Sequence, residues 1–182
     1  MSRARDIANI GDGIATADID DGAETAAKLF SGFANGITQT DLWRLVTTVT
    51  APAGTLETFE RADDASFNYI GNGMSYASGI WSFPTTGIYL VSLTSELRPD
   101  GVDFVNANLE VSSDSGSNYD SVAVTAANEA DSTTSVHIFV DVTNSGTFRV
   151  RVNCASFNPG SQILGNTDTN RTVVSFIRLG DT

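Results

Sequence analysis

The sequence predicts an all-β domain, an antiparallel sandwich or barrel, that begins near Asp41. From this point to the C-terminus, eight or more short β-branched and aromatic segments are separated by turn-forming residues. Several of these segments alternate apolar and polar side chains, which is the period of a strand with one buried face. No convincing helical pattern falls among them, so the segments are expected to pair with one another in sheets.

The expected strands are recognised one by one from this alternation. Val105, Ala107 and Leu109 alternate with polar residues, which predicts a strand with one wet face. Residues 88–93 are apolar on both sides, as expected for a central strand that is covered on both faces. The full set of expected strands is 43–49, 67–70, 88–93, 105–111, 122–124, 136–140, 148–152 and 172–179.

The first 40 residues have a different composition, rich in Ala, Gly and Asp, without the β alternation. Residues 23–30 are the best candidate for a short helix, and the apolar stretch that ends them is unusual for a free linker. Two interpretations remain open: a disordered tail, or a segment ordered by a partner or by its own oligomer. We therefore divide the chain into an attachment or oligomerisation segment, extended or partly helical, at 1–40 and a β-domain at 41–182. The candidate contact residues of the segment are Ile7, Ile10, Ile14, Leu29, Phe30 and Phe33.

Composition excludes several classes of function. Acidic residues outnumber basic ones by 22 to 10, and a net charge of -12 repels the phosphate backbone of nucleic acids. Cys154 is the only cysteine and His137 the only histidine, so zinc sites of several cysteines or histidines cannot form. No stretch approaches the roughly 18 apolar residues of a membrane-spanning helix. Neither nucleic acid binding nor membrane insertion is expected.

The residues needed for catalysis are sparse as well. A serine hydrolase would need His137 as its base, yet this side chain alternates with Val136 and Ile138 and faces away from the core. Any carboxylate pair for glycoside hydrolysis would form only in space, and no two acidic residues stand out. The oxygen-rich stretch 114–120 departs from a calcium-binding loop and is best interpreted as a solvated turn. We expect no enzyme and no cofactor, with Asp114 and Asp120 as weak candidates for calcium.

One stretch is more specific than the composition. Gly79, Trp81, Phe83, Gly87 and Tyr89 place glycine, aromatic, apolar, glycine and tyrosine residues in an order that resembles the signature of the C1q/TNF-like jelly-roll superfamily. Residues 140–150 resemble the late hairpin of that family, and residues 172–179 resemble its closing strand. The resemblance covers 41–182 and implies a jelly-roll sandwich that assembles as a homotrimer. Two departures are an early Pro84 and a Ser145-Gly146 pair in the hairpin.

The resemblance also suggests where the trimer contacts lie. In the family, aromatic residues at the positions of Tyr89 and Phe176 face a threefold axis. We therefore expect Trp81, Phe83, Tyr89 and Phe176 to line a trimer interface. The alternative is that these four side chains are simply part of the core of one chain.

The N-terminus carries a second, shorter resemblance. Residues 1–9, from Met1 to Asn9, resemble leaders of bacteriophage tail and fibre proteins. Together, the two resemblances imply a non-enzymatic protein on the outer surface of a virion, as a tail fibre, spike or head decoration. It would bind other virion proteins through residues 1–40 and expose the jelly roll for adhesion or shell reinforcement. The alternative is a secreted or surface C1q-like carbohydrate-binding protein that is not part of a virus.

If the protein is an adhesin, its polar loops are the expected recognition surface, because loops vary without disturbing the sheets. The three most polar stretches are 114–120, 128–134 and 158–170. Their carboxylates, amides and hydroxyls suit a host-surface glycan or a divalent ion.

Overall fold

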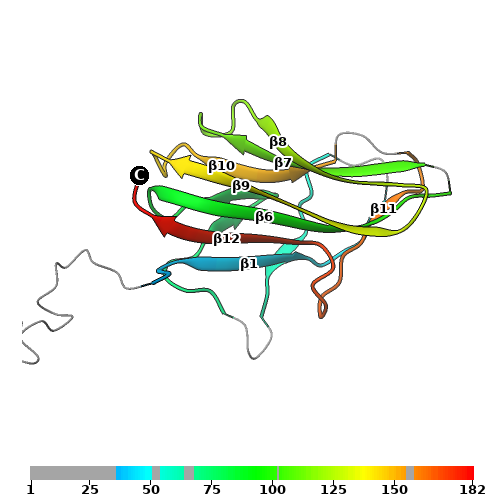
Figure 1. Ribbon diagram of the computed structural model, residues 1–182, viewed down its shortest axis with the longest axis horizontal. Coiled ribbons are helices and arrows are strands. Elements are labelled where there is room, and N and C mark those ends of the chain that lie inside the picture. The colour runs from blue at the N-terminus through cyan, green and yellow to red at the C-terminus, as the bar shows by residue number, and fades with distance from the viewer. Residues whose placement is uncertain (1–35, 51–53, 64–67, 102, 155–157) are drawn as a thin grey trace, which may run out of the picture. The chain divides into compact units, whose positions relative to one another are not determined.

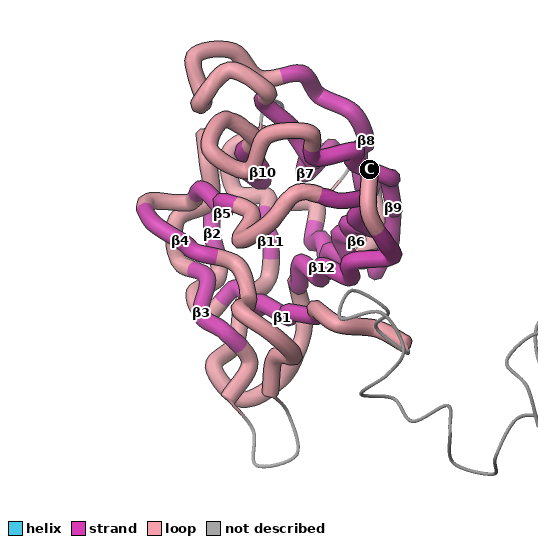
Figure 2. Tube along the Cα trace, turned by 90° about the vertical axis from the view of Figure 1, so that its left-hand side faces the viewer, coloured by secondary structure: helices cyan, strands magenta, loops and turns pink. Residues whose placement is uncertain are grey.

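Strands are the only regular elements in the part of the chain that the structure describes. The computed structural model describes residues 36–50, 54–63, 68–101, 103–154 and 158–182 (Figure 1). Strands β1 to β12 fall within these ranges, and no helix is present among them (Figure 2). The predicted all-β class is confirmed. The candidate helix at 23–30 lies outside the described residues.

One sheet has seven strands, in the order β2-β11-β6-β12-β1-β3, with β9 also paired to β6. The longest strand, β6, is bordered by β9 on one side and by β12 on the other, and every pairing is antiparallel. The strands of this sheet are β1 (Thr40–Leu45), β2 (Val49–Thr50), β3 (Phe59–Arg61), β6 (Gly87–Arg98), β9 (Ser132–Val142), β11 (Gln162–Ile163) and β12 (Val173–Gly180).

The second sheet has five strands, in the order β4-β5-β10-β7-β8. The chain passes from one sheet to the other between β5 and β6, between β6 and β7, and again between β8 and β9. Such crossings stack the two sheets as the layers of a sandwich. The strands of this sheet are β4 (Ser75–Ala77), β5 (Ile80–Ser82), β7 (Phe104–Ser112), β8 (Asp120–Asn128) and β10 (Arg149–Asn153).

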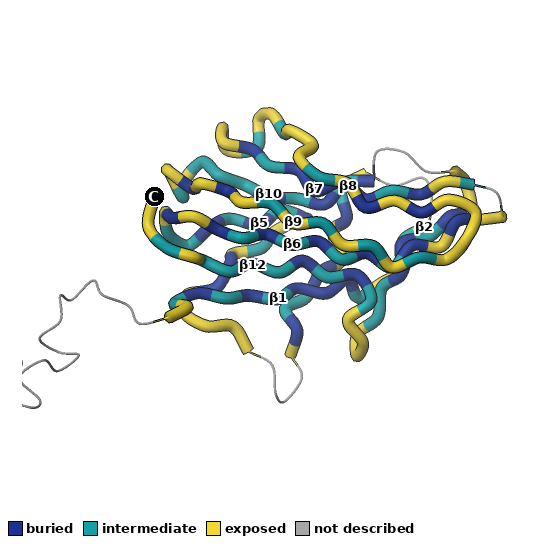
Figure 3. Tube along the Cα trace, in the orientation of Figure 1, coloured by how far each residue is buried: buried dark blue, intermediate teal, exposed yellow. Residues whose placement is uncertain are grey.

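The core lies between the two sheets and follows the alternation of the strands (Figure 3). Along β6, Tyr89, Val91 and Leu93 are buried, whereas the residues between them are only partly covered. Burying one such side chain stabilises the fold by about 1.5–3 kcal/mol. Opposite them, the five-stranded sheet contributes Trp81, Val105, Ala107, Leu109, Val150 and Val152.

Two strands are longer than the sequence pattern predicted. Strand β6 runs on to Arg98, and β8 has nine residues where only 122–124 had been expected. Both have a long partner, since β9 pairs with β6 over eleven positions and β7 pairs with β8 along its length. The hydrogen bonds to a neighbouring strand therefore override a weak local preference.

Other strands differ in kind. Strands β3, β4 and β11 were not predicted, because two or three residues are too few to show an alternation. The predicted strand at 67–70 does not form in the described residues, where Ile70 makes a single bridge to Thr40.

A buried ion pair connects β1 to β3 and to the turn that follows Ile70. The carboxylate of Asp41 accepts hydrogen bonds from Arg61 Nε at 2.8 Å and Nη2 at 2.9 Å. It also accepts from the backbone N–H of Met74 at 2.7 Å, and Arg61 donates back to the Met74 carbonyl at 2.9 Å. These bonds satisfy a carboxylate that is only 2% exposed, which offsets the cost of its burial.

The guanidinium of Arg61 contacts aromatic rings in addition to its hydrogen bonds with Asp41. It lies 4.7 Å from the ring centre of Trp43 and 4.3 Å from that of Tyr69, both within cation–π range. The hydrogen bond with Asp41 raises the pKa of Arg61 above its ordinary value. The Arg61 guanidinium therefore stays charged at neutral pH.

We expect Asp41→Ala to lower the free energy of unfolding by about 3 kcal/mol, because it leaves Arg61 and the Met74 N–H without their acceptor. The matched control is Asp131→Ala, which breaks the exposed Arg98–Asp131 pair and should cost no more than about 1 kcal/mol. Urea denaturation followed by tryptophan fluorescence measures both values. Equal losses for the two variants would contradict a special role for the buried pair.

Candidate functional site

The four aromatic residues expected at a trimer interface lie inside the sandwich. Trp81, Phe83, Tyr89 and Phe176 are each no more than 4% exposed. They pack on one another, with ring centres 4.8 Å apart for Phe83 and Tyr89 and 5.7 Å apart for Trp81 and Phe176. A side chain that is enclosed by its own chain has no surface left to contact a second subunit. The structure therefore corrects the trimer-interface assignment, and the four residues are core.

The outer face of the seven-stranded sheet carries a different apolar set. Strand register places Phe139 of β9, Leu90 of β6 and Ile177 of β12 side by side, and we call these three residues the Phe139 row. Side chains opposite one another on adjacent strands are near enough to form one surface. Phe139 is 72% exposed, the highest value among the large apolar side chains of the described residues. Ile88 and Leu179, also exposed, extend the surface toward the C-terminal end of β12.

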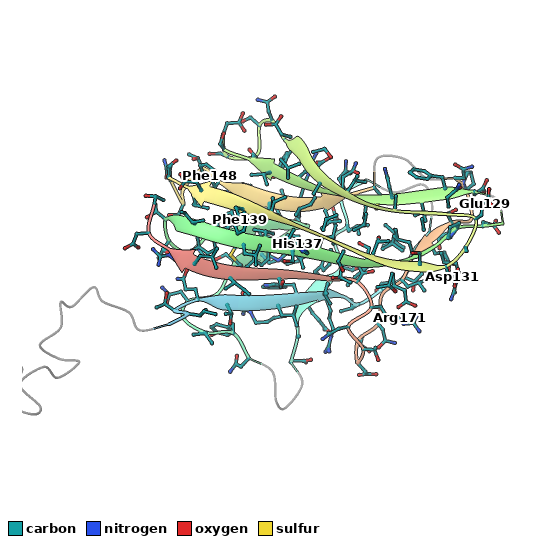
Figure 4. The ribbon with its side chains drawn as sticks, in the orientation of Figure 1. Glu129, Asp131, His137, Phe139, Phe148 and Arg171 are labelled. Atoms are coloured by element: carbon teal, nitrogen blue, oxygen red, sulfur yellow. The ribbon has the colours of Figure 1, made fainter. Side chains whose placement is uncertain are left out.

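The rest of this outer face becomes polar along the strands (Figure 4). One step from the Phe139 row, His137 pairs across the sheet with Ser92, which in turn pairs with Ser175. At the far end, Arg98 forms an ion pair with Asp131 at 3.0 Å, and Arg171 forms one with Glu96 at 3.0 Å. Apart from Asp141, which pairs with Ile88 at the apolar end, the outer face thus runs from apolar through hydroxyl-bearing to charged side chains.

The outer face of the five-stranded sheet has the opposite character where β7 and β10 meet. Glu110, only 6% exposed, accepts hydrogen bonds from Arg151 Nε at 2.6 Å and from the Asn153 amide at 3.0 Å. The Arg151 guanidinium lies 3.8 Å from the ring centre of Tyr119. These polar groups satisfy one another within a single chain. The Phe139 row has no comparable partner among the described residues, which makes it the candidate functional surface.

Sequence reasoning missed this surface, although a signal was present. Phe139 stands between Ile138 and Val140, at a position that the alternation assigns to the solvent side. Residues 88–93 were interpreted as covered on both faces, but the residues that the structure describes cover only the face with Tyr89 and Val91. Ile88 and Leu90 are thus apolar residues on the side that lacks a cover. Apolar residues on the solvent side of two paired strands are the sequence signal that would have indicated this apolar surface.

His137 is exposed on β9, as its alternation with Val136 and Ile138 predicted. Cys154 is buried, and burial raises the pKa of its thiol to about 12, so the thiol is protonated at neutral pH. In the part of the chain that the structure describes, no three His, Cys, Asp or Glu side chains come together as a metal site would require. No helix in this part is long and apolar enough to cross a membrane.

The loop with Asp114 and Asp120 is closed by its own hydrogen bonds. Asp114 Oδ1 accepts from Ser112 Oγ at 2.7 Å and from the Asn118 N–H at 3.0 Å, and Oδ2 accepts from the Asn118 amide at 2.6 Å. Both oxygens therefore face N–H and O–H donors, where a calcium site needs oxygen acceptors that face the ion. Asp120 begins β8 and pairs with Val111. The geometry gives Asp114 the role of an internal acceptor that orders the loop.

The three polar stretches do not form one recognition surface. The loop after Ser112 and the turn before Ser132 lie at opposite ends of the β7–β8 hairpin (Figure 1). Residues 158–170 are not a plain loop, because they contain β11 and the buried residues Ser161 and Leu164. The six candidate contact residues of the N-terminal segment, Ile7, Ile10, Ile14, Leu29, Phe30 and Phe33, lie outside the described residues.

We expect the pKa of Asp114 to be about 2, against an ordinary value of 3.8, because the backbone N–H of Asn118 and the Ser112 hydroxyl stabilise the charged form. A depressed pKa stabilises the closed loop above pH 4, and this contribution is lost as the pH falls through 2. An NMR titration of the carboxyl carbon measures the value. Ser112→Ala should move it toward 3.8, and a wild-type midpoint already near 3.8 would show that the loop is open.

Comparisons with known proteins support the fold alone. No family model matches the chain, and no curated protein is significantly similar to it in sequence. Among solved structures, murine APRIL at pH 8.5 superimposes with a TM-score of 0.58 and 11% identity, over 78% of this chain and 98% of that one. The Eiger TNF of S. frugiperda gives a TM-score of 0.58 and 14% identity, over 81% and 96%. The chain therefore has the TNF-like jelly-roll fold that its sequence pattern predicted.

Proposed function

We propose that this protein is a non-enzymatic, self-associating jelly-roll module, a homotrimer in which the outer face of the seven-stranded sheet is the subunit interface. The observation that carries the proposal is the Phe139 row, an exposed apolar surface that runs inward from the edge strand β9 over β6 and β12. Contiguous exposed apolar surface marks a site of interaction. A second copy of the chain is its expected partner, because the sequence of β6 is that of a strand covered on both faces.

The edge of the molecule supplies a second apolar surface. Val122 and Val124 of β8 are 45% and 48% exposed, and β8 is the edge strand of the five-stranded sheet. A ring of identical subunits uses heterologous contacts, in which one patch binds a different patch on the next subunit. The Phe139 row and the β8 patch provide two such surfaces on one chain. The jelly-roll resemblance supports three subunits as the size of the ring.

The polarity gradient of the outer face also suits a ring whose axis runs along the strands. Residues at the same height along this axis then face one another in neighbouring subunits, so that apolar residues contact apolar residues. The ion pairs of Arg98 with Asp131 and of Arg171 with Glu96 lie at the far end, where they stay hydrated. One charge does lie at the apolar end, because Asp141 of β9 pairs with Ile88 and has no ion pair among the described residues, so it must stay hydrated at the rim of the ring.

We further propose that the trimer is exposed on the outer surface of a bacteriophage particle, as a fibre, spike or head decoration that serves adhesion or shell reinforcement. The resemblance of residues 1–9 to leaders of phage appendage proteins supports this proposal. Residues 1–40 would then bind the particle. Co-purification with capsids or tails at a fixed stoichiometry tests it, and a protein that is always recovered free of particles would contradict it.

We expect Phe139→Asp to dissociate the trimer, raising the dissociation constant by about 100-fold or more, because the new carboxylate would be buried without a partner. The matched control is Phe104→Asp, which changes an exposed phenylalanine of the five-stranded sheet. Light scattering should give three times 19.2 kDa for the wild type and the control, and a single chain mass for Phe139→Asp.

Two outcomes would overturn the assignment. A wild-type protein that is a clean monomer at micromolar concentration would remove the trimer. A Phe139→Asp variant that stays fully trimeric would place the interface elsewhere. Phe139→Leu, which keeps an apolar side chain, should remain assembled and thereby separate loss of contact from general destabilisation.

We expect that deletion of residues 1–35 leaves a soluble, β-rich protein, because β1 and its contacts begin after this point. Circular dichroism and thermal melting measure the fold, and particle occupancy measures attachment. Occupancy should be lost while the fold is kept. A truncated protein that joins the particle at the wild-type level would refute the attachment role.

A further inference from the structure

A hollow lies between the residues that precede β1 and the C-terminal part of β12. It has a volume of about 300 Å³, which is at the lower end of the range for small-molecule sites. All of its walls come from one chain, so it does not depend on self-association. We call it the Arg178 hollow, and its lining residues are Thr38, Gln39, Gly71, Asn72, Thr85 and Arg178.

Gln39 is a buried polar side chain in this hollow, with only 9% of its surface exposed. Its Oε1 accepts a hydrogen bond from the Tyr89 hydroxyl at 2.6 Å and another from the Thr85 hydroxyl at 3.1 Å. These two bonds fix the orientation of the amide. Its Nε2 has no hydrogen-bond acceptor in the part of the chain that the structure describes. Because this nitrogen is not enclosed, water reaches it in the hollow, and an acceptor atom of a ligand can replace that water.

Arg178 contributes a cation that already holds a carboxylate. Its Nε donates to the Thr86 carbonyl at 3.0 Å, and its Nη2 donates to the carboxylate of Asp181. The carbonyl bond fixes the guanidinium, whereas the Asp181 side chain is 88% exposed. An ion pair with one solvent-exposed member contributes little to stability. An incoming carboxylate can therefore replace Asp181 on the same guanidinium fork.

Another part of the lining is a turn that needs glycine at position 71. Gly71 has a φ of +73°, and a Cβ at this position would lie 2.5 Å from the Thr38 carbonyl oxygen and 2.8 Å from Gln39 Cγ. The turn therefore packs directly on Gln39 and limits its movement. The next residue, Asn72, presents an exposed amide at the rim that makes no hydrogen bond within the described ranges. The hollow is thus rigid and rich in donors before any ligand binds.

We propose that the Arg178 hollow binds the carboxylate of a small sugar acid, of the size of a hexuronate. The guanidinium and the Gln39 Nε2 bind the carboxylate, which is an acceptor with two oxygens. The Asn72 amide and the Thr38 hydroxyl are left for the ring hydroxyls of the sugar. This site goes beyond the proposed structural function and stands whether or not the chain forms a trimer.

A second hollow also contains an arginine, and a comparison of the two shows how the arginine of the Arg178 hollow differs. It has a volume of about 250 Å³ and is lined by Arg149 together with Ser75, Tyr76 and Ser82, among others. Arg149 donates to the backbone carbonyls of Ser145, Gly146 and Phe148, and so its guanidinium is occupied by its own chain. Arginine in a hollow is therefore not sufficient, and Arg149 provides a matched control.

The test is a calorimetric titration of the full chain with sodium glucuronate. We expect a dissociation constant of about 1 mM, and no heat with glucose, which lacks the carboxylate. Arg178→Gln should weaken binding about tenfold, while Arg149→Gln should leave it unchanged. Gln39→Glu places a carboxylate where Nε2 was and should abolish binding. Methyl glucuronide tests whether the site accepts a sugar acid that is linked within a glycan. Such a site tolerates the glycosidic methyl group, whereas a site for the free sugar acid does not.

Asp181→Asn is a variant that should gain affinity, and so it tests the site even if a loss-of-binding variant fails to fold. Removing the competing carboxylate should tighten glucuronate binding about threefold, and a misfolded protein cannot show a gain. Thermal melting of each variant checks the fold. Equal binding of glucose and glucuronate, an unchanged constant in Arg178→Gln, or weaker binding in Asp181→Asn would each overturn the proposal.

Discussion

The buried carboxylate of Asp41 is the group on which the arrangement of β1, β3 and the turn after Ile70 depends. Its oxygens receive the Arg61 guanidinium and the Met74 N–H, so three segments far apart in sequence share one acceptor. Gly73 permits this approach, because a Cβ there would lie 2.9 Å from Arg61 Nη2 and 3.0 Å from Asp41 Oδ2. The same turn contains Gly71, which packs on Gln39. The ion pair thus fixes both a corner of the core and one wall of the Arg178 hollow.

The two outer faces of the sandwich differ in how their side chains are satisfied. On the five-stranded sheet, Glu110 binds Arg151 and Asn153, and a single chain completes the network. On the seven-stranded sheet, Phe139 remains 72% exposed beside Leu90 and Ile177. An apolar row on the outer face of a sheet costs free energy in water unless another surface covers it. This contrast is why self-association through the seven-stranded sheet, rather than recognition through the polar sheet or the loops, is the function we favour.

The local pattern of the sequence predicted the β class and the alternation of the long strands, and the family resemblance predicted the jelly roll. Sequence reasoning missed β3, β4 and β11, which are held in place by partners distant in sequence and not by their own two or three residues. It also assigned four core aromatic residues to a trimer interface, because neither the family resemblance nor the aromatic content tells which face of a strand a side chain occupies. Tyr89 and Phe176 point inward, and the register that brings Phe139 beside Leu90 exists only once β9 has paired with β6. The orientation of Gln39 depends likewise on Tyr89, fifty positions away.

Three consecutive residues of β12 serve three different surfaces. Phe176 enters the core, Ile177 joins the Phe139 row, and Arg178 lines the hollow at the end of the sandwich. The first two follow from the alternation of a strand. The third requires more, because Arg178 would otherwise lie among the core aromatics, where a guanidinium could not be hydrated. The register shift between Arg178 and Gly180 falls at this point, and such bulges redirect a side chain at the end of a pairing. Gly87 leaves the space, since a Cβ there would lie 2.5 Å from Arg178 Nε. The irregular end of β12 is therefore what allows one strand to contribute to the core, to the proposed interface and to the proposed ligand site.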